Sequence, residues 1–453
     1  MSLRDRIKRM TTGSFLRDVA TLSLGTVGGR LISLAALPIV TRLYTPEDFS
    51  LLAVYLALVT TIAVAACLRL EIAIPLADSD DDAVRLLGLS LLAALGVGAV
   101  TLIVALVAPV AIASMLGRPQ LAPYLWLVPL GIIMTASYSV LQYWATRARR
   151  FGSIARTRIT QAAIGAATML GLGWFGLAPL GLLIGNMFNI GAGGFRLGAE
   201  AIARDRDRLR LVSWQGMRAT FHKFRRYPIY STPESLANVA GVQIPVILIA
   251  ALAGAEAGFL FLAMQVMTAP MSLLGSSISQ VYMSRAPEEL RAGRLAPFTL
   301  GIMKQLVQVG VGPLIFVGLV APVVFPWIFG PDWARAGVIV AWLVPWMALQ
   351  FITSPVSMVM YVTSRQRAML VLTILGFFLR VGGVLISYLA FPDYLILGFV
   401  MGSIANYICA GIWITHAAGF SRAHYFDLFS SLFHWSIPSW IVLGSLMAWL
   451  INI

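Results

Sequence analysis

The sequence predicts an all-α polytopic membrane protein, and three observations carry this prediction. Of the 453 residues, 59% are hydrophobic and only 11% are charged, whereas soluble domains carry about 25% charged residues. Apolar runs of roughly 20 residues, long enough to cross a bilayer as a helix, recur along the whole chain. These runs lack the strict alternation of polar and apolar residues that a transmembrane barrel requires. Helices are therefore the structure that satisfies the backbone within lipid.

The predicted membrane helices number about 13, within a range of 12 to 14, as two groups of six and one final helix. The runs are 17–41, 49–69, 84–111, 122–145, 157–175 and 178–198, then 228–252, 256–282, 298–328, 336–361, 367–389 and 394–416, and finally 436–453. A cleaved signal peptide is the alternative for the first run, which follows a basic N-terminus. The run is too long for one and it contains Arg30, so a first membrane helix is the better interpretation.

The basic residues between the runs predict the orientation. With the N-terminus in the cytoplasm, 28 of the 33 Lys and Arg residues lie on the cytoplasmic side, as the positive-inside rule requires. Arg42, Arg118 and Arg335 lie on the opposite side, while Arg30 and Arg380 lie within runs. The net charge of +14 therefore reflects membrane topology, and we expect no nucleic-acid partner.

The order of runs and basic stretches predicts four segments. They are an N-terminal six-helix lobe (1–203), a basic cytoplasmic linker (204–226), a C-terminal six-helix lobe (227–418), and an amphipathic segment with an extra helix (419–453). The lobes begin alike, since Pro38 and Pro245 each precede an apolar stretch, acidic and small residues, and then Phe49 and Phe259. Both lobes start inside, so they predict a parallel repeat related by a pseudo-two-fold axis along the membrane normal, with a central cavity between the lobes.

Several passages resemble the polysaccharide and O-antigen flippases of the Wzx type, in the multidrug/oligosaccharidyl-lipid/polysaccharide exporter superfamily. They read TRLYTPEDFSLLAVYLAL from residue 41, LRLEIAIPLADSDDDA from residue 68, RRYPIYSTPESLANVAGVQIPVIL from residue 225, and AGFLFLAMQVMTAPMSLLGSSISQVY from residue 257. The resemblance implies two six-helix lobes around a cavity and transport by alternating access. Family members usually have twelve or fourteen helices, so a count of thirteen is a departure, and it concerns the C-terminus.

The resemblance also implies a function. The substrate would be an undecaprenyl-diphosphate-linked oligosaccharide, flipped from the cytoplasmic to the outer leaflet of the bacterial cytoplasmic (inner) membrane. Its product would serve cell-surface polysaccharide synthesis, namely O-antigen of lipopolysaccharide, capsule or exopolysaccharide. The expected partners are the lipid-linked oligosaccharide, membrane lipids and other polysaccharide-assembly proteins.

Two arginines inside apolar runs are the predicted substrate-binding residues. Arg30 lies thirteen residues into its run, ~20 Å along a helix, and Arg380 lies at a similar depth of ~21 Å. A guanidinium near the bilayer centre costs at least ~2.5 kcal/mol, so each should face a wet or protein-lined interior. Arg matches phosphate with a bidentate fork, so both are predicted to bind the diphosphate. The alternative for each is a structural role inside one lobe.

Glu234 is the predicted ion-coupling residue, because its pKa should rise if it lies deep in an apolar run. Pairing with Arg225 or Arg226, or a favourable position at a helix start, is the alternative. Asp18 and Glu71 lie nearer an interface and are weaker candidates. Three amides, Asn238, Gln243 and Gln265, could meet sugar hydroxyls in a cavity. Amides of this kind also join helices to one another.

Two other classes of function, an antiporter and an enzyme, predict different features of the sequence. A small-molecule antiporter of the same superfamily predicts an acidic cation site, whereas the charges at mid-span are arginines. A polysaccharide polymerase or glycosyltransferase predicts a large external loop or a metal site. The acids at 78–82 instead suit the start of a helix, and the four histidines lack metal-ligand spacing on one helix face. We therefore predict a protein that is not an enzyme, with no metal and no cofactor. Gly25 and Gly29 are spaced for close helix packing.

Overall fold

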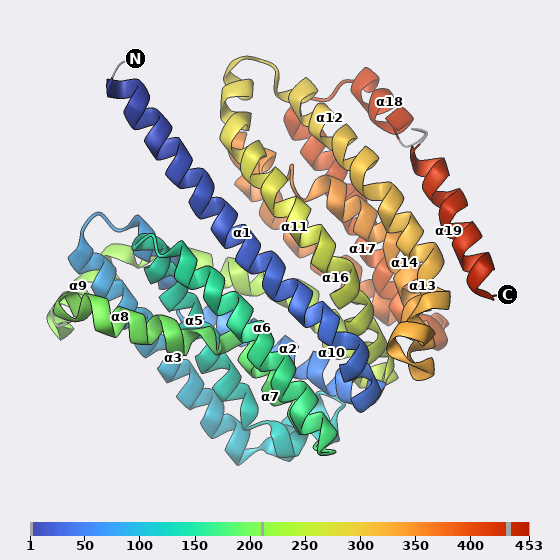
Figure 1. The fold of residues 1–453 in the computed structure, drawn as a ribbon, viewed down its shortest axis with the longest axis horizontal. Coiled ribbons are helices and arrows are strands. Elements are labelled where there is room, and N and C mark those ends of the chain that lie inside the picture. The colour runs from blue at the N-terminus through green and yellow to red at the C-terminus, as the bar shows by residue number, and fades with distance from the viewer. Residues whose placement is uncertain (1–2, 210–212, 432–435, 453) are drawn as a thin grey trace. The chain divides into compact units, whose positions relative to one another are not determined.

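The computed structural model describes residues 3–209, 213–431 and 436–452, and within these ranges every element is a helix (Figure 1). The all-α prediction is confirmed. By internal contacts the chain forms two compact units. The first comprises Met1–Tyr44 with Val54–Val239, and the second comprises Thr45–Ala53 with Ala240–Ile453.

The first unit begins with the long helix α1 (Leu3–Leu43) and ends within α10. Its elements are α1, most of α2 (Pro46–Ala66), η1 (Leu70–Leu76), α3 (Asp80–Val107), α4 (Pro109–Met115), η2 (Pro119–Tyr124), α5 (Leu127–Arg147), α6 (Phe151–Trp174), α7 (Leu180–Gly191), α8 (Gly193–Leu209), α9 (Trp214–Phe224), η3 (Tyr227–Ser231) and the start of α10 (Thr232–Ala253). The predicted run 178–198 is divided between α7 and α8 at Ala192.

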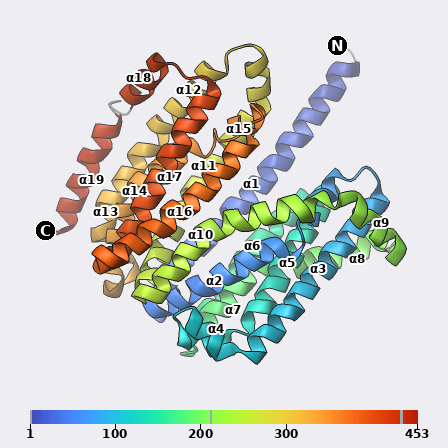
Figure 2. The ribbon, with the colours of Figure 1, turned by 180° about the vertical axis from the view of Figure 1, so that it is seen from behind.

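The second unit holds the remaining helices (Figure 2). Its elements after α10 are α11 (Glu256–Arg291), α12 (Leu295–Leu306), η4 (Val307–Val311), α13 (Gly312–Phe329), η5 (Pro331–Trp333), α14 (Ala334–Thr353), α15 (Val359–Val362), α16 (Gln366–Ala390), η6 (Pro392–Tyr394), α17 (Leu395–Ala418), α18 (Arg422–Ser431) and α19 (Ser436–Asn452). The predicted run 336–361 ends early, at Thr353, and the run 298–328 contains the π-helical turn η4.

Among the described residues, eight helices are long and apolar enough to cross a membrane. They are Ala20–Leu43, Pro46–Ala66, Asp80–Val107, Tyr227–Ala253, Leu295–Phe329, Pro331–Thr353, Arg367–Ala390 and Pro392–Ala418. Two shorter apolar helices are Glu256–Thr268 and Ile437–Ile451. The other predicted runs are also helical but are shorter or more polar, as in α7, which has only 12 residues.

The segment 204–226, predicted as a linker, holds the end of α8 and the whole of α9. Asp82 at the start of α3 accepts hydrogen bonds from Thr220 Oγ1 at 3.2 Å and from Lys223 Nζ at 2.7 Å. The described part of this segment therefore packs on the first unit, and the contact-defined boundary follows Val239, inside α10. The predicted limits of the two six-helix lobes, 1–203 and 227–418, therefore remain predictions.

Helices α1 and α6 lie side by side because two glycines one turn apart let their backbones meet. A Cβ on Gly25 would lie 2.5 Å from Cα of Ala155, and a Cβ on Gly29 would lie 2.8 Å from the carbonyl oxygen of Arg158. The close packing predicted for this pair is confirmed.

In the second unit, the two phenylalanines that the repeat predicts to be equivalent share one partner. The ring of Trp333, only 1% exposed, lies 4.7 Å from the ring of Phe49 and 5.8 Å from that of Phe259, centroid to centroid. Beside them, Ser50 Oγ donates a hydrogen bond to the carbonyl of Gly254 at 2.8 Å. These contacts bind the first turns of α2 into the second unit.

Candidate functional site

Arg380, a predicted diphosphate ligand, lies on α16 in the interior of the second unit and is 9% exposed. Its guanidinium carbon lies 5.9 Å from the centroid of the Tyr407 ring on α17, a cation–π arrangement. The Nε atom is buried without a hydrogen-bond partner. Within the part of the chain that the structure describes, no carboxylate forms an ion pair with Arg380. It is thus a buried cation held by an aromatic ring.

Small residues allow α16 and α17 to enclose this arginine. A Cβ on Gly402 would lie 3.0 Å from Cα of Arg380, and a Cβ on Gly398 would collide with the carbonyl oxygen of Gly383. Close backbone approach through glycine is typical of membrane helix pairs. The close pairing of α16 and α17 buries the guanidinium of Arg380, so its charge is costly to place there.

Arg30, the second predicted diphosphate ligand, lies on α1 in the first unit and has an exposed side chain. It follows Gly29, which packs on α6, so Arg30 projects from another face of the helix. None of the described residues makes a hydrogen bond or ion pair with it. The alternative for Arg30 was a structural role in which it pairs with a residue inside one lobe. No described residue forms such a pair with it.

The predicted coupling and amide residues differ in exposure. Glu234, in the first turn of α10, is exposed, as is Asn238 one turn later. Gln243 and Gln265 are half-buried. In the described chain no ion pair joins Glu234 to a neighbouring arginine, and an acid in the first turn is favoured by the helix dipole.

Glu71 is the most buried carboxylate in the described chain, at 3% exposed, although the sequence ranked it below Glu234. It lies in η1, after a backbone that turns through left-handed conformations at Leu68 and Arg69. Arg69 Nη1 lies 3.5 Å from Glu71 Oε1, while Glu71 Oε2 is buried without a partner. Burial raises the pKa of the Glu71 carboxyl, and a backbone hydrogen bond and Arg69 oppose that effect.

The acids at 78–82 form the start of α3, as expected. Ser79 caps the helix by accepting a hydrogen bond from the Asp82 backbone N–H at 3.1 Å, and three aspartates occupy the first turn. Arg147 of α5 pairs with Asp80 at 2.9 Å and also donates to the carbonyl of Ala77 at 2.7 Å. Among the described residues, no group of three His, Cys, Asp or Glu side chains could hold a metal ion.

A second cluster of charges joins α8 to the helices beside it. Asp205 accepts a hydrogen bond from Trp144 Nε1 at 2.9 Å and pairs with Arg150 at 2.7 Å. Asp205 is 7% exposed, and its hydrogen bond raises the pKa of the Arg150 guanidinium. Asp205 in the first unit is thus paired with a cation, whereas Arg380 in the second unit has no acid beside it among the described residues.

Comparison with known proteins agrees with this architecture. The family model described as "Polysaccharide biosynthesis protein" matches residues 39–337. No match was found among curated protein sequences.

Solved structures share the fold at low sequence identity. The structure "Lipid II flippase MurJ, inward closed conformation" is 12% identical with a TM-score of 0.72, covering 95% of this chain and 97% of its own. A MATE transporter in complex with MaL6 is 15% identical with a TM-score of 0.59, covering 91% and 96%. A MOP superfamily transporter from Pyrococcus furiosus is 16% identical with a TM-score of 0.57, covering 89% and 96%. The chain is a multi-pass membrane protein that belongs to the polysaccharide biosynthesis protein family and has the fold of the MOP superfamily.

Proposed function

We propose that this protein flips an undecaprenyl-diphosphate-linked oligosaccharide from the cytoplasmic to the outer leaflet of the bacterial cytoplasmic membrane by alternating access. The product would serve O-antigen, capsule or exopolysaccharide synthesis. Family membership and the fold shared with a lipid II flippase support this class of substrate. The observation that carries the proposal is Arg380, a buried guanidinium whose neighbour is an aromatic ring and whose Nε has no partner.

The proposed mechanism assigns a role to each predicted residue. Arg30 and Arg380 bind the diphosphate, because charge-assisted hydrogen bonds to a guanidinium are among the strongest available. Binding the phosphates to cations offsets the cost of moving a charged head group across a ~30 Å hydrocarbon layer. Tyr407 holds the Arg380 side chain in place.

The remaining assignments concern energy and sugar binding. Glu234 couples transport to an ion gradient, and Asn238, Gln243 and Gln265 meet sugar hydroxyls. The lipid tail stays in the bilayer throughout. The N-terminus is cytoplasmic, as the distribution of basic residues predicts.

A small-molecule antiporter is the second candidate function, and the MATE-like fold favours it. A cation-selective exporter would need an acidic site, whereas Glu71, the most buried carboxylate among the described residues, is paired with Arg69, and the buried charge without an acid beside it is Arg380.

One experiment separates the two functions. The intact chain is expressed in a strain that lacks its polysaccharide flippase and, separately, in a strain that lacks its drug efflux transporters. We expect restored surface polysaccharide in the first strain and unchanged drug resistance in the second. Drug resistance without surface polysaccharide would establish the antiporter instead.

A further inference from the structure

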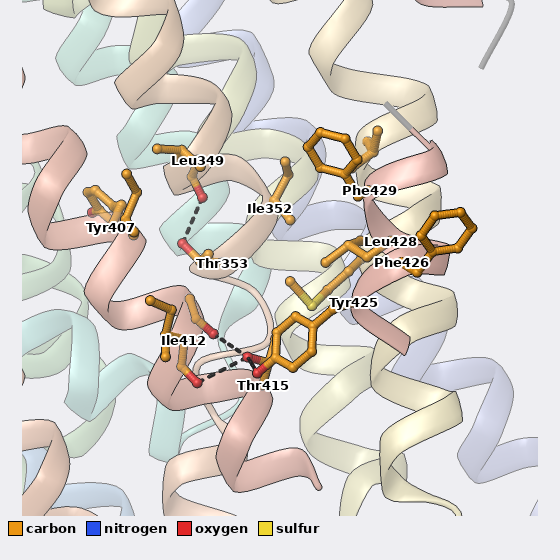
Figure 3. A pocket seen from close by; sticks show the side chains of 14 residues that line it. Leu349, Ile352, Thr353, Tyr407, Ile412, Thr415, Tyr425, Phe426, Leu428 and Phe429 are labelled. Atoms are coloured by element: carbon orange, nitrogen blue, oxygen red, sulfur yellow. Dashed lines mark hydrogen bonds between the residues drawn. The ribbon is translucent and has the colours of Figure 1, made fainter. Parts of the chain in front are cut away.

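The second unit contains a cavity of about 790 Å³ (Figure 3). One of its lining side chains, Tyr407, also contacts Arg380. It is bounded by α12, η4, α14, α17 and α18. Most of the side chains that line it are aliphatic or aromatic. Four lining side chains carry a hydroxyl, namely Thr353, Tyr407, Thr415 and Tyr425.

The threonine hydroxyls in the wall are already bonded within the protein. Thr353 Oγ1 donates to the carbonyl of Leu349 at 2.7 Å, and Thr415 Oγ1 lies 2.8 Å from both the carbonyl of Gly411 and the hydroxyl of Tyr425 (Figure 3). A cavity holds water only when polar groups are available to bind it. The wall therefore favours a hydrocarbon occupant.

Helix α18 forms one side of the cavity. It follows α17 after Gly419, whose left-handed conformation ends that helix. Phe426 and Phe429 line the cavity and are also 76% and 60% exposed, so they present apolar rings both to the cavity and to the surface of the protein. Lys304 of α12 pairs with Asp427 at 2.7 Å and ties α18 to the wall.

A cation lies one turn from this aromatic rim. Arg422, exposed at the first position of α18, is four residues before Phe426 and so on the same side of the helix. On the predicted topology α18 lies at the cytoplasmic leaflet, which is rich in anionic lipids that attract basic residues. The one acid of α18, Asp427, is already paired with Lys304.

We propose that the cavity binds one acyl chain of an anionic membrane phospholipid, whose head group lies beside Arg422. The chain fills the apolar space between α12, α14, α17 and α18, and Phe426 and Phe429 close over it. The volume falls within the ~300–1,000 Å³ range of small-ligand pockets, which suits a single acyl chain rather than the whole long isoprenoid of a carrier lipid. The cavity shares Tyr407 with the surroundings of Arg380, but binding of a phospholipid there does not depend on the proposed transport.

Photolabelling tests this proposal. The full chain is reconstituted in lipid nanodiscs with phosphatidylglycerol that carries a diazirine near the end of one acyl chain, and the labelled peptides are mapped by mass spectrometry. We expect labelling of residues that line the cavity, at least five-fold stronger than with the matching phosphatidylcholine probe. Equal labelling by the two probes, or labelling spread over all membrane helices, would overturn the proposal.

Filling the cavity provides the decisive variant. Gly411 lines it, and the one neighbour within 4 Å of an added Cβ is a Thr353 methyl group at 3.4 Å, so Gly411→Leu should place its side chain in the cavity and reduce labelling at least five-fold. Gly301→Leu is the control, because Gly301 on α12 is exposed and an added Cβ would meet nothing within 4 Å. Full labelling of Gly411→Leu, in protein that stays monodisperse, would contradict the proposal.

Arg422→Ala tests the head group separately. We expect the preference for phosphatidylglycerol to fall to the level of phosphatidylcholine while the mapped peptides stay the same. An unchanged preference would remove the role of Arg422. Stronger labelling of the same peptides by a diazirine-bearing polyprenyl phosphate than by phosphatidylglycerol would replace the proposed occupant with the carrier lipid.

Discussion

Arg150 and Arg380 each pack against other helices of their own unit, but their guanidinium groups have different neighbours. In the first unit Arg150 pairs at 2.7 Å with Asp205, which also accepts a hydrogen bond from Trp144. In the second unit Arg380 is more deeply buried, and its neighbour is the ring of Tyr407. Breaking a buried ion pair costs about 3–5 kcal/mol because a charge is left uncompensated.

The charge of Arg150 therefore stabilises the fold, whereas the charge of Arg380 destabilises it. The Arg150 pair joins α8 to the start of α6, and its removal should damage the first unit. Arg380 brings a desolvation cost with no acid to offset it among the described residues, so a fold selected for stability alone would place an apolar residue there. We infer that Arg380 is retained for binding an anion.

The largest effect is expected from removing both predicted diphosphate ligands. Arg30→Ala with Arg380→Ala should abolish complementation of surface polysaccharide in a flippase-deficient strain, because the head group loses both cations. Arg380→Lys should impair it, since the charge remains but the fork is lost. Membrane abundance, measured by immunoblot, should stay near that of the wild type.

The control for this pair is Arg294→Ala, which removes an exposed arginine paired with Glu289 at 3.0 Å. It should complement fully, since exposed pairs contribute little. Full complementation by the double alanine variant would refute the diphosphate assignment. Loss of that variant from the membrane would instead assign both arginines a structural role.

The sign of the effect on stability should differ between the half-buried Arg150 and the buried Arg380. Asp205→Ala leaves Arg150 without its acid and should cost about 3–5 kcal/mol, seen as a lower melting temperature in detergent. Arg380→Met removes an uncompensated charge and keeps a long apolar chain, so the melting temperature should equal or exceed that of the wild type. Glu200→Ala, which breaks a pair on the same helix in which Arg204 is 65% exposed, should change it little. If Arg380→Met is as destabilising as Asp205→Ala, the contrast between the units fails.

A smaller effect is expected at Glu71, the buried carboxylate of the first unit. Burial raises the pKa of the Glu71 carboxyl above its ordinary value of 4.5, so the folded state holds the proton more tightly than the unfolded state does. Its contribution to stability is therefore present at low pH and falls as pH rises from 4.5 through the raised pKa. Each unit of pKa difference corresponds to ~1.4 kcal/mol. Glu71→Gln should flatten the decline in melting temperature as pH rises above 4.5, and an unchanged decline would assign it to other groups.

The sequence predicts the helices well because hydropathy alone determines which runs can lie in lipid. It also predicts that Arg380 lies inside, since a charge within an apolar run must avoid lipid. Tyr407 was missed because no spacing in the sequence links it to Arg380, and only the packing of α16 on α17 brings them together. The burial of Glu71 was underestimated because it depends on the left-handed turn at Leu68 and Arg69, which hydropathy does not reveal. Hydropathy likewise does not reveal the tertiary hydrogen bonds that Asp82 accepts from Thr220 and Lys223, which pack the basic segment on the first unit.

The smallest effect on stability is expected at Glu234, an exposed carboxylate that can be compared with the buried carboxylate of Glu71. Its side chain is exposed and has no ion pair within the described chain, so Glu234→Gln should leave the melting temperature unchanged. If Glu234 couples transport to a proton gradient, the same variant should transport at a rate that no longer responds to an imposed gradient. The measurement is uptake of a fluorescent lipid-linked oligosaccharide into proteoliposomes across a series of imposed proton gradients, with Glu71→Gln assayed in parallel. Normal gradient dependence in Glu234→Gln would remove Glu234 from coupling. Loss of that dependence in Glu71→Gln alone would transfer the role to the buried carboxylate, because a carboxyl whose pKa is raised by burial exchanges its proton closer to physiological pH than an exposed one does.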